Sequence, residues 1–343
     1  MEERIVIITG ANSGIGKASS MKFAQEGWRV VMACRNVTKG EKVRMEIMEK
    51  TGNGKVDLLG VDLASMASIQ DFCRAFQRKY ERLDVLIHNA GHFDHGQKVY
   101  PLSPDGIELT FAINTVGPFL MTRLLLDSLK NSPDARVIHA CSTNIRHYFD
   151  PGRRIDFDNL QGEYQKSRKY SAYKMYGDSK MALLMLTFDM AKRLEQDRIR
   201  VNAVQIPAIR LSKETMGQFK SGWNLAARIQ SALGDTQESM AETYYHIAAS
   251  EALRGVTGRL INERRETVHA SHYAEKPAQQ VRQFFDKGVY PRYADDASNR
   301  RTTWNLCIHL TDPYAGVKGR QQETDEETDT KLISEEDHSR IPT

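Results

Sequence analysis

The first 205 residues alternate short, largely apolar runs with longer amphipathic stretches, and this alternation restricts the fold more than any other feature. Apolar runs without a polar face belong in a sheet covered on both sides, and they occupy residues 5–9, 29–34, 56–61, 83–88, 136–141 and 200–205. The stretches between them predict helices over residues 13–26, 39–51, 65–79, 104–130 and 173–195. Because strands that alternate with helices form parallel pairs, we expect an α/β fold with one doubly wound parallel sheet and helices on both faces.

No change in composition interrupts the chain before about residue 312, so we expect a single domain over residues 1–311. Residues 312–343 form an acidic tail. Its last part, residues 320–343, carries a net charge of −5, and residues 321–337 hold almost no apolar side chains, which predicts disorder. The remaining 319 residues carry +9 without a dense basic run, and this pattern gives no indication of a nucleic-acid partner.

The composition favours a globular protein in a reducing compartment. With 343 residues, 40% of them hydrophobic, the chain can bury a substantial core. The longest unbroken apolar run, residues 181–186, is far too short to cross a bilayer, and the few residues before the first strand leave no room for a signal peptide. The four cysteines lack C-x-x-C spacing, so neither a zinc ribbon nor any other metal site is indicated. We expect a cytoplasmic protein with no transmembrane segment.

A glycine-rich turn, TGANSGIG at residues 9–16, lies directly between the first strand and the first helix. Glycines allow the backbone to approach a pyrophosphate closely, and the helix N-terminus supplies N–H groups and the positive end of a dipole. The spacing is G-x-x-x-G-x-G rather than G-x-G-x-x-G, and an ordinary strand-to-helix turn is the alternative. We predict that the turn binds dinucleotide phosphates through Gly10, Asn12, Ser13, Gly14, Ile15 and Gly16.

The end of the second strand indicates which dinucleotide binds. An NAD site usually places an acidic residue there to accept the ribose 2′-OH, whereas this strand ends Ala33-Cys34-Arg35. A guanidinium can pair with a 2′-phosphate in forked geometry, so Arg35 favours NADP, with a solvated surface arginine as the alternative. Asp62 and Leu63, after the third strand, lie where they could reach the adenine, although Asp62 could also be a helix N-cap.

Several motifs in the same order resemble the short-chain dehydrogenase/reductase family over roughly residues 3–310. They are TGANSGIG, HNAG at 88–91, Asn114 in INTVGPF, Ser142 in RVIHACS, and Tyr176-Gly-Asp-Ser-Lys180. ACRN at 33–36, VDLASMAS at 61–68 and TGRLIN at 257–262 are similar to the retinol dehydrogenase and WW-domain oxidoreductase branch, here without WW domains. The resemblance implies a Rossmann fold, NADP as cofactor, a small-molecule alcohol or carbonyl substrate, and cofactor contacts from Asn89, Ala90 and Gly91. The resemblance is compatible with a homo-oligomer but does not require one.

The residues that the resemblance assigns to catalysis suit hydride transfer between an alcohol and a carbonyl. A proton must reach the substrate oxygen as hydride reaches the carbon, and a phenol with a pKa of about 10 is a poor acid–base group at neutral pH. Lys180 lies four residues after Tyr176 on the same helix face, where its charge would favour the phenolate. Ser142 could hold the substrate oxygen. By resemblance, Lys180 and Tyr176 also contact the cofactor, and Asn114 positions a water.

The Tyr-x-x-x-Lys spacing occurs a second time, at Tyr170 and Lys174. We favour Tyr176 because the strongly apolar residues 181–190 follow Lys180 and would anchor that helix on the sheet. The family also often has a serine directly before the lysine, as Ser179 is here. His88 replaces the first asparagine of the family's NNAG motif, and we interpret it as a structural residue rather than a catalytic one.

The substrate site is predicted from three segments at the carboxyl ends of the strands: residues 92–103, 143–173 and 206–235. They supply Phe93, Tyr100, Tyr148, Phe149, Met216, Phe219 and Trp223, which favours a largely apolar carbonyl compound such as a retinoid or steroid. Where the family has Pro-Gly after the sixth strand, residues 205–211 read QIPAIRL, without the glycine. The alternative hypothesis is therefore a non-catalytic NADP-binding protein of the same fold.

Overall fold

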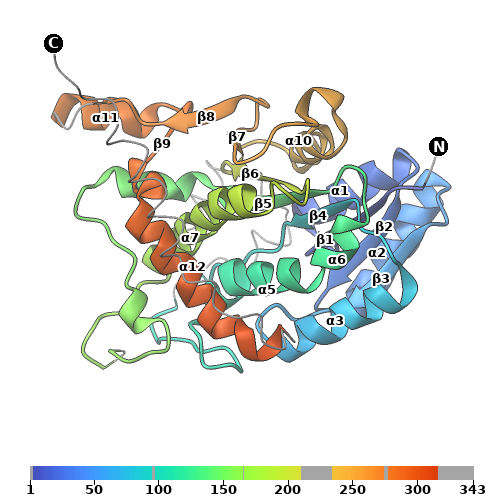
Figure 1. The fold of residues 1–343 in the computed structure, drawn as a ribbon, viewed down its shortest axis with the longest axis horizontal. Helices are drawn as coiled ribbons and strands as arrows, with labels where there is room; N and C mark the ends of the chain where they lie inside the picture. The colour runs from blue at the N-terminus through green and yellow to red at the C-terminus, as the bar shows by residue number, and fades with distance from the viewer. Residues whose placement is uncertain (1–2, 95–96, 165, 210–233, 274–276, 316–343) are drawn as a thin grey trace, which may run out of the picture.

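The computed structural model describes residues 3–94, 97–164, 166–209, 234–273 and 277–315 (Figure 1). In these residues one nine-stranded sheet has the order β3-β2-β1-β4-β5-β6-β7-β8-β9. Its strands are β1 (Ile5–Thr9), β2 (Arg29–Cys34), β3 (Val56–Gly60), β4 (Val85–His88), β5 (Arg136–Ser142), β6 (Arg200–Ile206), β7 (Leu260–Ile261), β8 (Thr267–Ala270) and β9 (Val289–Tyr290). Pairing is parallel except between β7 and β8. The doubly wound sheet is confirmed, and the C-terminal strands extend it.

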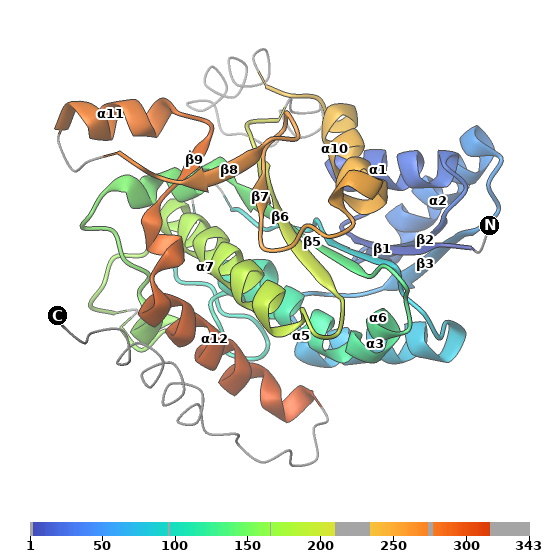
Figure 2. The same ribbon diagram turned by 45° about the horizontal axis from the view of Figure 1, so that its top comes forward.

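Helices cover both faces of the sheet (Figure 2). One face carries α1 (Gly14–Gln25), α2 (Val37–Thr51) and α10 (Gln237–Ala249). The other carries α3 (Met66–Lys79), α5 (Gly117–Leu124), α6 (Leu126–Lys130) and α7 (Ala172–Arg193), with α12 (Ala297–Thr311) lying outside α7. Within β1, Ile5 and Ile7 pack on the α7 side while Val6 and Ile8 pack on the α1 side. Such double burial explains why these strands are apolar throughout.

The predicted helix over residues 104–130 is wrong at its start and in its continuity. Gly106 has a positive φ of 74°, and the Glu108 carboxylate accepts a hydrogen bond from the Phe111 N–H, so that helix α4 (Leu109–Phe111) begins only after this cap. A π-helical turn, η1 (Ala112–Val116), separates α4 from α5. Pro118 lacks the N–H that an α-helix would direct at the Asn114 carbonyl, which favours a wider turn at this point.

The chain continues to pack on the body slightly beyond the predicted boundary at residue 311. After α12 comes a short 3-10 turn, η6 (Asp312–Tyr314), in which Asp312 pairs with Arg123 at 2.9 Å and the Tyr314 carbonyl accepts a hydrogen bond from Gln70 at 2.5 Å. The rest of the predicted acidic tail, residues 316–343, lies outside the described residues.

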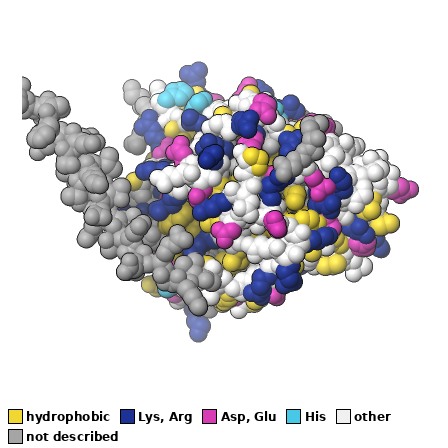
Figure 3. All heavy atoms as spheres, turned by 45° about the vertical axis from the view of Figure 1, so that its right-hand side comes forward, with side chains coloured by type: hydrophobic (Ala, Val, Ile, Leu, Met, Phe, Trp, Pro, Cys, Tyr) yellow, Lys and Arg dark blue, Asp and Glu magenta, His cyan; other side chains and the backbone are white. Residues whose placement is uncertain are grey.

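Basic and acidic side chains are interspersed on the face of the molecule that carries the N-terminal strands (Figure 3). Lys17 pairs with Glu46, and Arg29 pairs with both Glu3 and Asp57. This face therefore carries no extended field of one sign. Within the described ranges, no helix combines the length and the apolar character that a membrane span requires.

Candidate active site

A cavity of about 510 Å³ opens at the carboxyl ends of the strands, where the chain order reverses between β1 and β4. This topological switch point is where open α/β sheets bind their ligands. Most of the predicted site residues line the cavity: Gly10, Asn12, Ser13, Ile15, Arg35, Asp62, Leu63, Asn89, Ala90, Gly91, Tyr176 and Lys180. Gly14, Gly16, Asn114 and Ser142 are not part of the lining. His92 and Ile206, the first residues of two predicted substrate segments, also line the cavity, whereas sequence reasoning missed others, including Asn36, Ile113, Ala140 and Cys141.

The glycine turn leaves room for a phosphate at the start of α1. A Cβ on Gly16 would lie 2.6 Å from Asn89 Nδ2 and 2.8 Å from the carbonyl carbon of Gly10, so a side chain there does not fit. The N-cap residue Ser13 makes no side-chain capping bond, unlike the N-cap Asn36 of α2 or Ser65 of α3. The first N–H groups of α1 therefore face the cavity without a capping side chain, as an anion site requires.

Thr9 joins the glycine turn to the segment after β4. Its hydroxyl accepts a hydrogen bond from the Ala90 N–H at 2.9 Å, and its carbonyl accepts one from Asn89 Nδ2 at 2.9 Å. Thr9 is fully buried, so these bonds hold β1 and β4 together at the switch point. The sequence contained a usable signal, since Thr9 is the one hydroxyl residue of an otherwise aliphatic strand.

Arg35 and Asp62 lie at the end of the cavity formed by β2 and β3. Arg35 is exposed and has no hydrogen-bond or ion-pair partner among the described residues. Asp62 is not the N-cap of α3, a role that Ser65 fills. Instead, Asp62 Oδ1 accepts a hydrogen bond from the Ala64 N–H at 3.0 Å, which holds the turn that presents Asp62 and Leu63 to the cavity.

Tyr176, Ser142, Lys180 and Asn114 come together beside the other end of the cavity. The Ser142 side chain interacts with the Tyr176 hydroxyl and lowers the pKa of that phenol. Lys180 Nζ donates to the Ala140 carbonyl at 2.7 Å and lies 5.8 Å from the centre of the Tyr176 ring. A Cβ on Gly91 would lie 3.6 Å from Lys180 Nζ and 3.7 Å from Asn114 Oδ1, so both side chains reach the segment after β4.

The Asn114 side chain makes three hydrogen bonds to its surroundings. Its Oδ1 accepts from the His92 N–H at 2.7 Å, and its Nδ2 donates to the His92 carbonyl and to Ser179 Oγ, both at 3.0 Å. A water can donate to the second lone pair of Oδ1 or to the backbone carbonyl, to which Pro118 can donate no hydrogen bond. The side chain itself clamps the segment after β4 onto α7.

Burial governs the ionisation of the tyrosine–lysine pair in this structure. It raises the pKa of Tyr176 above its usual value, and the hydrogen bond from Ser142 offsets only part of that rise. It lowers the pKa of Lys180 to about 8. The expectation that Lys180 favours the phenolate is therefore not met here, because the ammonium group is bonded to Ala140 while the phenol is desolvated.

The competing Tyr170–Lys174 motif has a structural role. The Tyr170 hydroxyl donates to the buried carboxylate of Glu108 at 2.8 Å, the same carboxylate that caps α4. Lys174 pairs with Asp178 at 3.2 Å and donates to the Arg154 carbonyl at 3.3 Å. Neither residue lines the cavity.

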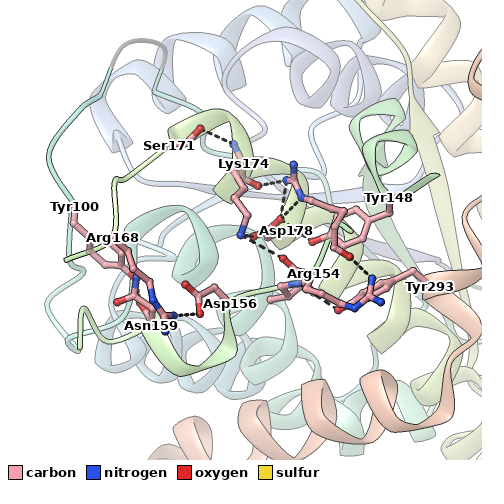
Figure 4. A network of polar contacts seen from close by, with 12 residues as sticks. Tyr100, Tyr148, Arg154, Asp156, Asn159, Arg168, Ser171, Lys174, Asp178 and Tyr293 are labelled. Atoms are coloured by element: carbon pink, nitrogen blue, oxygen red, sulfur yellow. Dashed lines mark hydrogen bonds and ion pairs between the residues drawn. The ribbon is translucent and has the colours of Figure 1, made fainter. Parts of the chain in front are cut away.

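A buried carboxylate ties the long excursion between Ser142 and Tyr176 to α7 (Figure 4). Asp178 is 1% exposed and accepts hydrogen bonds from the Tyr148 hydroxyl at 2.6 Å and from Arg153 at 2.8 Å. Arg153 also donates to the Lys174 carbonyl at 2.9 Å. Because Asp178 lies between Tyr176 and Lys180 in the chain, the network fixes the excursion relative to the helix that carries both.

Two predicted substrate-contacting aromatic residues are turned away from the site. The Tyr148 hydroxyl points to Asp178, and the Tyr100 hydroxyl donates to the Asn159 carbonyl, beside the ring of Tyr170 (Figure 4). Hydrogen bonds to Asp178 and to the Asn159 carbonyl, rather than apolar packing, decide the orientations of Tyr148 and Tyr100. Amino-acid composition alone does not reveal such contacts. Phe93 does lie at the site, stacked on the Tyr176 ring with centroids 4.7 Å apart. Met216, Phe219 and Trp223 lie outside the described residues.

His88 is a buried structural residue, stacked on His139 of the neighbouring strand at 5.2 Å. Its Nε2 bonds to Thr122 Oγ1 at 2.8 Å, and His139 Nδ1 bonds to Thr187 Oγ1 at 2.9 Å. Each hydroxyl donates to a carbonyl of its own helix, so each imidazole donates to its threonine and is neutral. Burial holds the pKa of His88 far below its usual value and lowers that of His139 to about 3.

Acidification is expected to destabilise the protein through this histidine pair. The unfolded chain binds protons at a pKa of about 6.5 that the folded chain does not bind, so the free energy of unfolding falls below about pH 6.5, by up to about 1.4 kcal/mol per pH unit for each histidine. Urea unfolding at pH 7.5 and 5.0 measures the loss. His139→Asn should lose about 2 kcal/mol less than the unmodified protein. His309→Asn, at an exposed position of α12, should lose as much as the unmodified protein, and equal losses in all three would contradict the interpretation.

A doubly wound sheet with an uncapped, glycine-lined helix start at its switch point defines a dinucleotide-binding protein. Family models described as short chain dehydrogenase and as Enoyl-(Acyl carrier protein) reductase match residues 4–150 and 162–262. Retinol dehydrogenase 12 of Mus musculus is 36% identical over 260 residues, covering 76% of this chain and 78% of the relative. Retinol dehydrogenase 11 of Homo sapiens is 35% identical over 257 residues, covering 74% and 76%. The chain belongs to the short-chain dehydrogenase/reductase family, and it is an oxidoreductase of that family.

Solved structures agree on the fold. A short-chain dehydrogenase from Shigella flexneri 2a, solved in complex with NADP, has a TM-score of 0.59 to this chain and covers 77% of it, with 98% of its own length matched. Its sequence identity is 22%, so the likeness concerns the fold alone. The predicted family and the predicted Rossmann architecture are both confirmed.

Proposed function

We propose that the protein is an NADP(H)-dependent oxidoreductase that interconverts a lipophilic alcohol and its carbonyl compound. The observation that carries the proposal is that Tyr176 and Lys180 line the same cavity as Arg35, whose guanidinium has no hydrogen-bond or ion-pair partner among the described residues. The family supplies the nicotinamide chemistry. The relatives named retinol dehydrogenases support a lipophilic substrate.

The residues of the cavity fit a nicotinamide dinucleotide phosphate. The glycine turn and the uncapped start of α1 suit the pyrophosphate, and Arg35 suits a 2′-phosphate through forked charge-assisted hydrogen bonds. Asp62 and Leu63 lie beside Arg35, on the adenine side of the cavity. When bound, NADPH supplies the hydride that reduces a carbonyl carbon.

The chain's own groups manage the proton. Because burial raises the pKa of Tyr176, its hydroxyl remains protonated at neutral pH and can donate to a carbonyl oxygen as that oxygen gains charge. The Ser142 hydroxyl, which interacts with the Tyr176 side chain, holds the same oxygen in place. Lys180, with its pKa lowered to about 8, still carries a charge at neutral pH, and that positive charge stabilises the phenolate that remains after Tyr176 has given up its proton.

A panel of aldehydes and ketones with NADPH tests the activity, with the absorbance of the reduced cofactor as readout. We expect turnover with apolar aldehydes. The panel member with the highest kcat/KM should belong to this group. Tight NADPH binding without turnover on any member would favour the non-catalytic alternative instead.

Cofactor choice is expected to depend on Arg35. The protein should bind NADPH at least about tenfold more tightly than NADH, a difference of about 1.4 kcal/mol. Arg35→Ala should remove most of this preference and leave the Kd for NADH nearly unchanged, as measured by fluorescence titration. Arg254→Ala, at an exposed arginine outside the cavity, is the matched control and should leave both affinities unchanged. Equal affinities in the unmodified protein would overturn the assignment of NADP.

A further inference from the structure

A continuous series of aromatic rings leads from Tyr176 to the C-terminal helix α11 (Pro277–Phe285). Phe93 stacks on Tyr176 at 4.7 Å and lies 6.2 Å from the ring of Tyr173. Tyr173 lies 5.1 Å from His147, which in turn lies 5.8 Å from Phe284 of α11. We call the four residues Phe93, Tyr173, His147 and Phe284 the aromatic wall.

Each residue of the aromatic wall belongs to a segment that contains a residue of the candidate site or that packs against such a segment. Tyr173 precedes Tyr176 by three residues and so lies on the same face of α7. His147 belongs to the 3-10 turn η2 (Thr143–Phe149) that directly follows Ser142, and α11 packs against this turn (Figure 1). Phe93 follows His92, which lines the cavity. The wall therefore begins at the predicted proton donor and extends away from the dinucleotide end.

Two members of the aromatic wall are fixed by a hydrogen bond to each other, and two members keep much of their surface exposed. His147 Nε2 and the Tyr173 hydroxyl are hydrogen-bonded at 2.6 Å, which fixes both rings. Burial lowers the pKa of His147, so this imidazole is neutral at pH 7. Tyr173 is 48% exposed and Phe284 39% exposed. The wall thus keeps uncharged aromatic surface exposed beside Tyr176, and burying that surface under an apolar ligand would be favourable.

We propose that the aromatic wall binds the apolar chain of an elongated substrate whose oxygen lies at Tyr176, and that Phe284 sets the chain-length preference. This proposal rests on the proposed function and adds the shape of the substrate to it. Phe284 follows Tyr176 by more than 100 residues in the chain and is a specificity-determining residue. A short aldehyde reaches Phe93 only, whereas a longer chain continues along Tyr173 and His147 to α11.

A homologous series of straight-chain aldehydes from butanal to dodecanal tests the proposal, with NADPH at saturation. In the unmodified protein KM should fall about two- to threefold per added methylene, because each methylene leaves water for the wall. Phe284→Ala should raise KM at least about tenfold for dodecanal and less than about twofold for butanal.

Phe285→Ala is the matched control, because it removes the same side chain from the adjacent, 75% exposed position of α11. It should leave the whole KM series unchanged. A chain-length series that is flat in the unmodified protein, or that Phe284→Ala and Phe285→Ala change equally, would overturn the proposal while the oxidoreductase activity stands.

A binding measurement separates failure of the wall from failure of the enzyme. With NADPH already bound, primary alcohols cannot be oxidised, so calorimetry reads their affinity without turnover. Dodecanol should bind at least about tenfold more weakly to Phe284→Ala than to the unmodified protein, with butanol unaffected. If no aldehyde is turned over but this difference appears, the wall is supported and the proposed activity is not. If it is absent, the wall is overturned.

Discussion

Tyr176→Phe is expected to lower kcat by about 10³-fold or more while the Kd for NADPH stays within a few-fold of its original value. The ring and its stacking on Phe93 survive the substitution, and only the hydroxyl is lost. That hydroxyl is the group proposed to deliver the proton to the substrate oxygen. Stopped-flow measurement of NADPH oxidation, together with fluorescence titration of NADPH, separates the chemical step from cofactor binding.

Tyr170→Phe is the control for that experiment, since it removes one oxygen from the competing motif. Its hydroxyl serves the buried Glu108, so its loss should lower the free energy of unfolding by about 1–3 kcal/mol and leave kcat unchanged. The opposite result, in which Tyr170→Phe abolishes turnover and Tyr176→Phe does not, would show that the wrong tyrosine has been assigned. Full activity in both variants would exclude the proposed proton donor altogether.

Gly16→Ala is expected to weaken NADPH binding about 10- to 100-fold and to lower the free energy of unfolding by about 1–3 kcal/mol. The added methyl group would lie 2.8 Å from the carbonyl carbon of Gly10 and 2.6 Å from Asn89 Nδ2, so the phosphate-binding turn and the segment after β4 must separate. Calorimetry with NADPH and urea unfolding measure the two effects.

Gly54→Ala provides the comparison. It adds the same methyl group at a position where the new Cβ would meet no atom within 4 Å and where φ is not positive. The NADPH affinity and the free energy of unfolding should therefore both remain unchanged. Unchanged NADPH affinity in Gly16→Ala would mean that the dinucleotide does not approach this turn, and the cofactor placement would need revision.

The first six strands could be predicted to within two residues because their physical signal is local. A strand buried on both faces is apolar at nearly every position, as β1 is up to its last residue, and a glycine such as Gly10 or Gly52 ends an element where a left-handed backbone is needed. By contrast, β7 and β9 have two residues each, which is too short for any periodicity to appear.

The candidate site could be predicted where one short motif contains the relevant residues, as in the glycine turn. The sequence could not choose between Tyr170 and Tyr176 on spacing alone, because the deciding partner, Glu108, lies more than 60 residues earlier. The late start of the helix at Leu109 and the orientation of Tyr148 also depend on single buried carboxylates. A polar contact between distant residues leaves no periodic trace, so only the folded chain reveals it.

The position of α12 has a consequence for synthesis on the ribosome. Trp304 packs on Phe119 at 5.1 Å, Arg123 bonds to Thr311, and Gln70 bonds to Tyr314, which lies 244 residues later. The outer surface of α5 and α7 therefore remains uncovered until nearly the whole described chain has emerged. Translation reaches α12 only after every residue proposed for cofactor and proton chemistry has left the exit tunnel. Completion of this layer is thus a late step of folding, because it depends on contacts between residues that lie far apart in the chain.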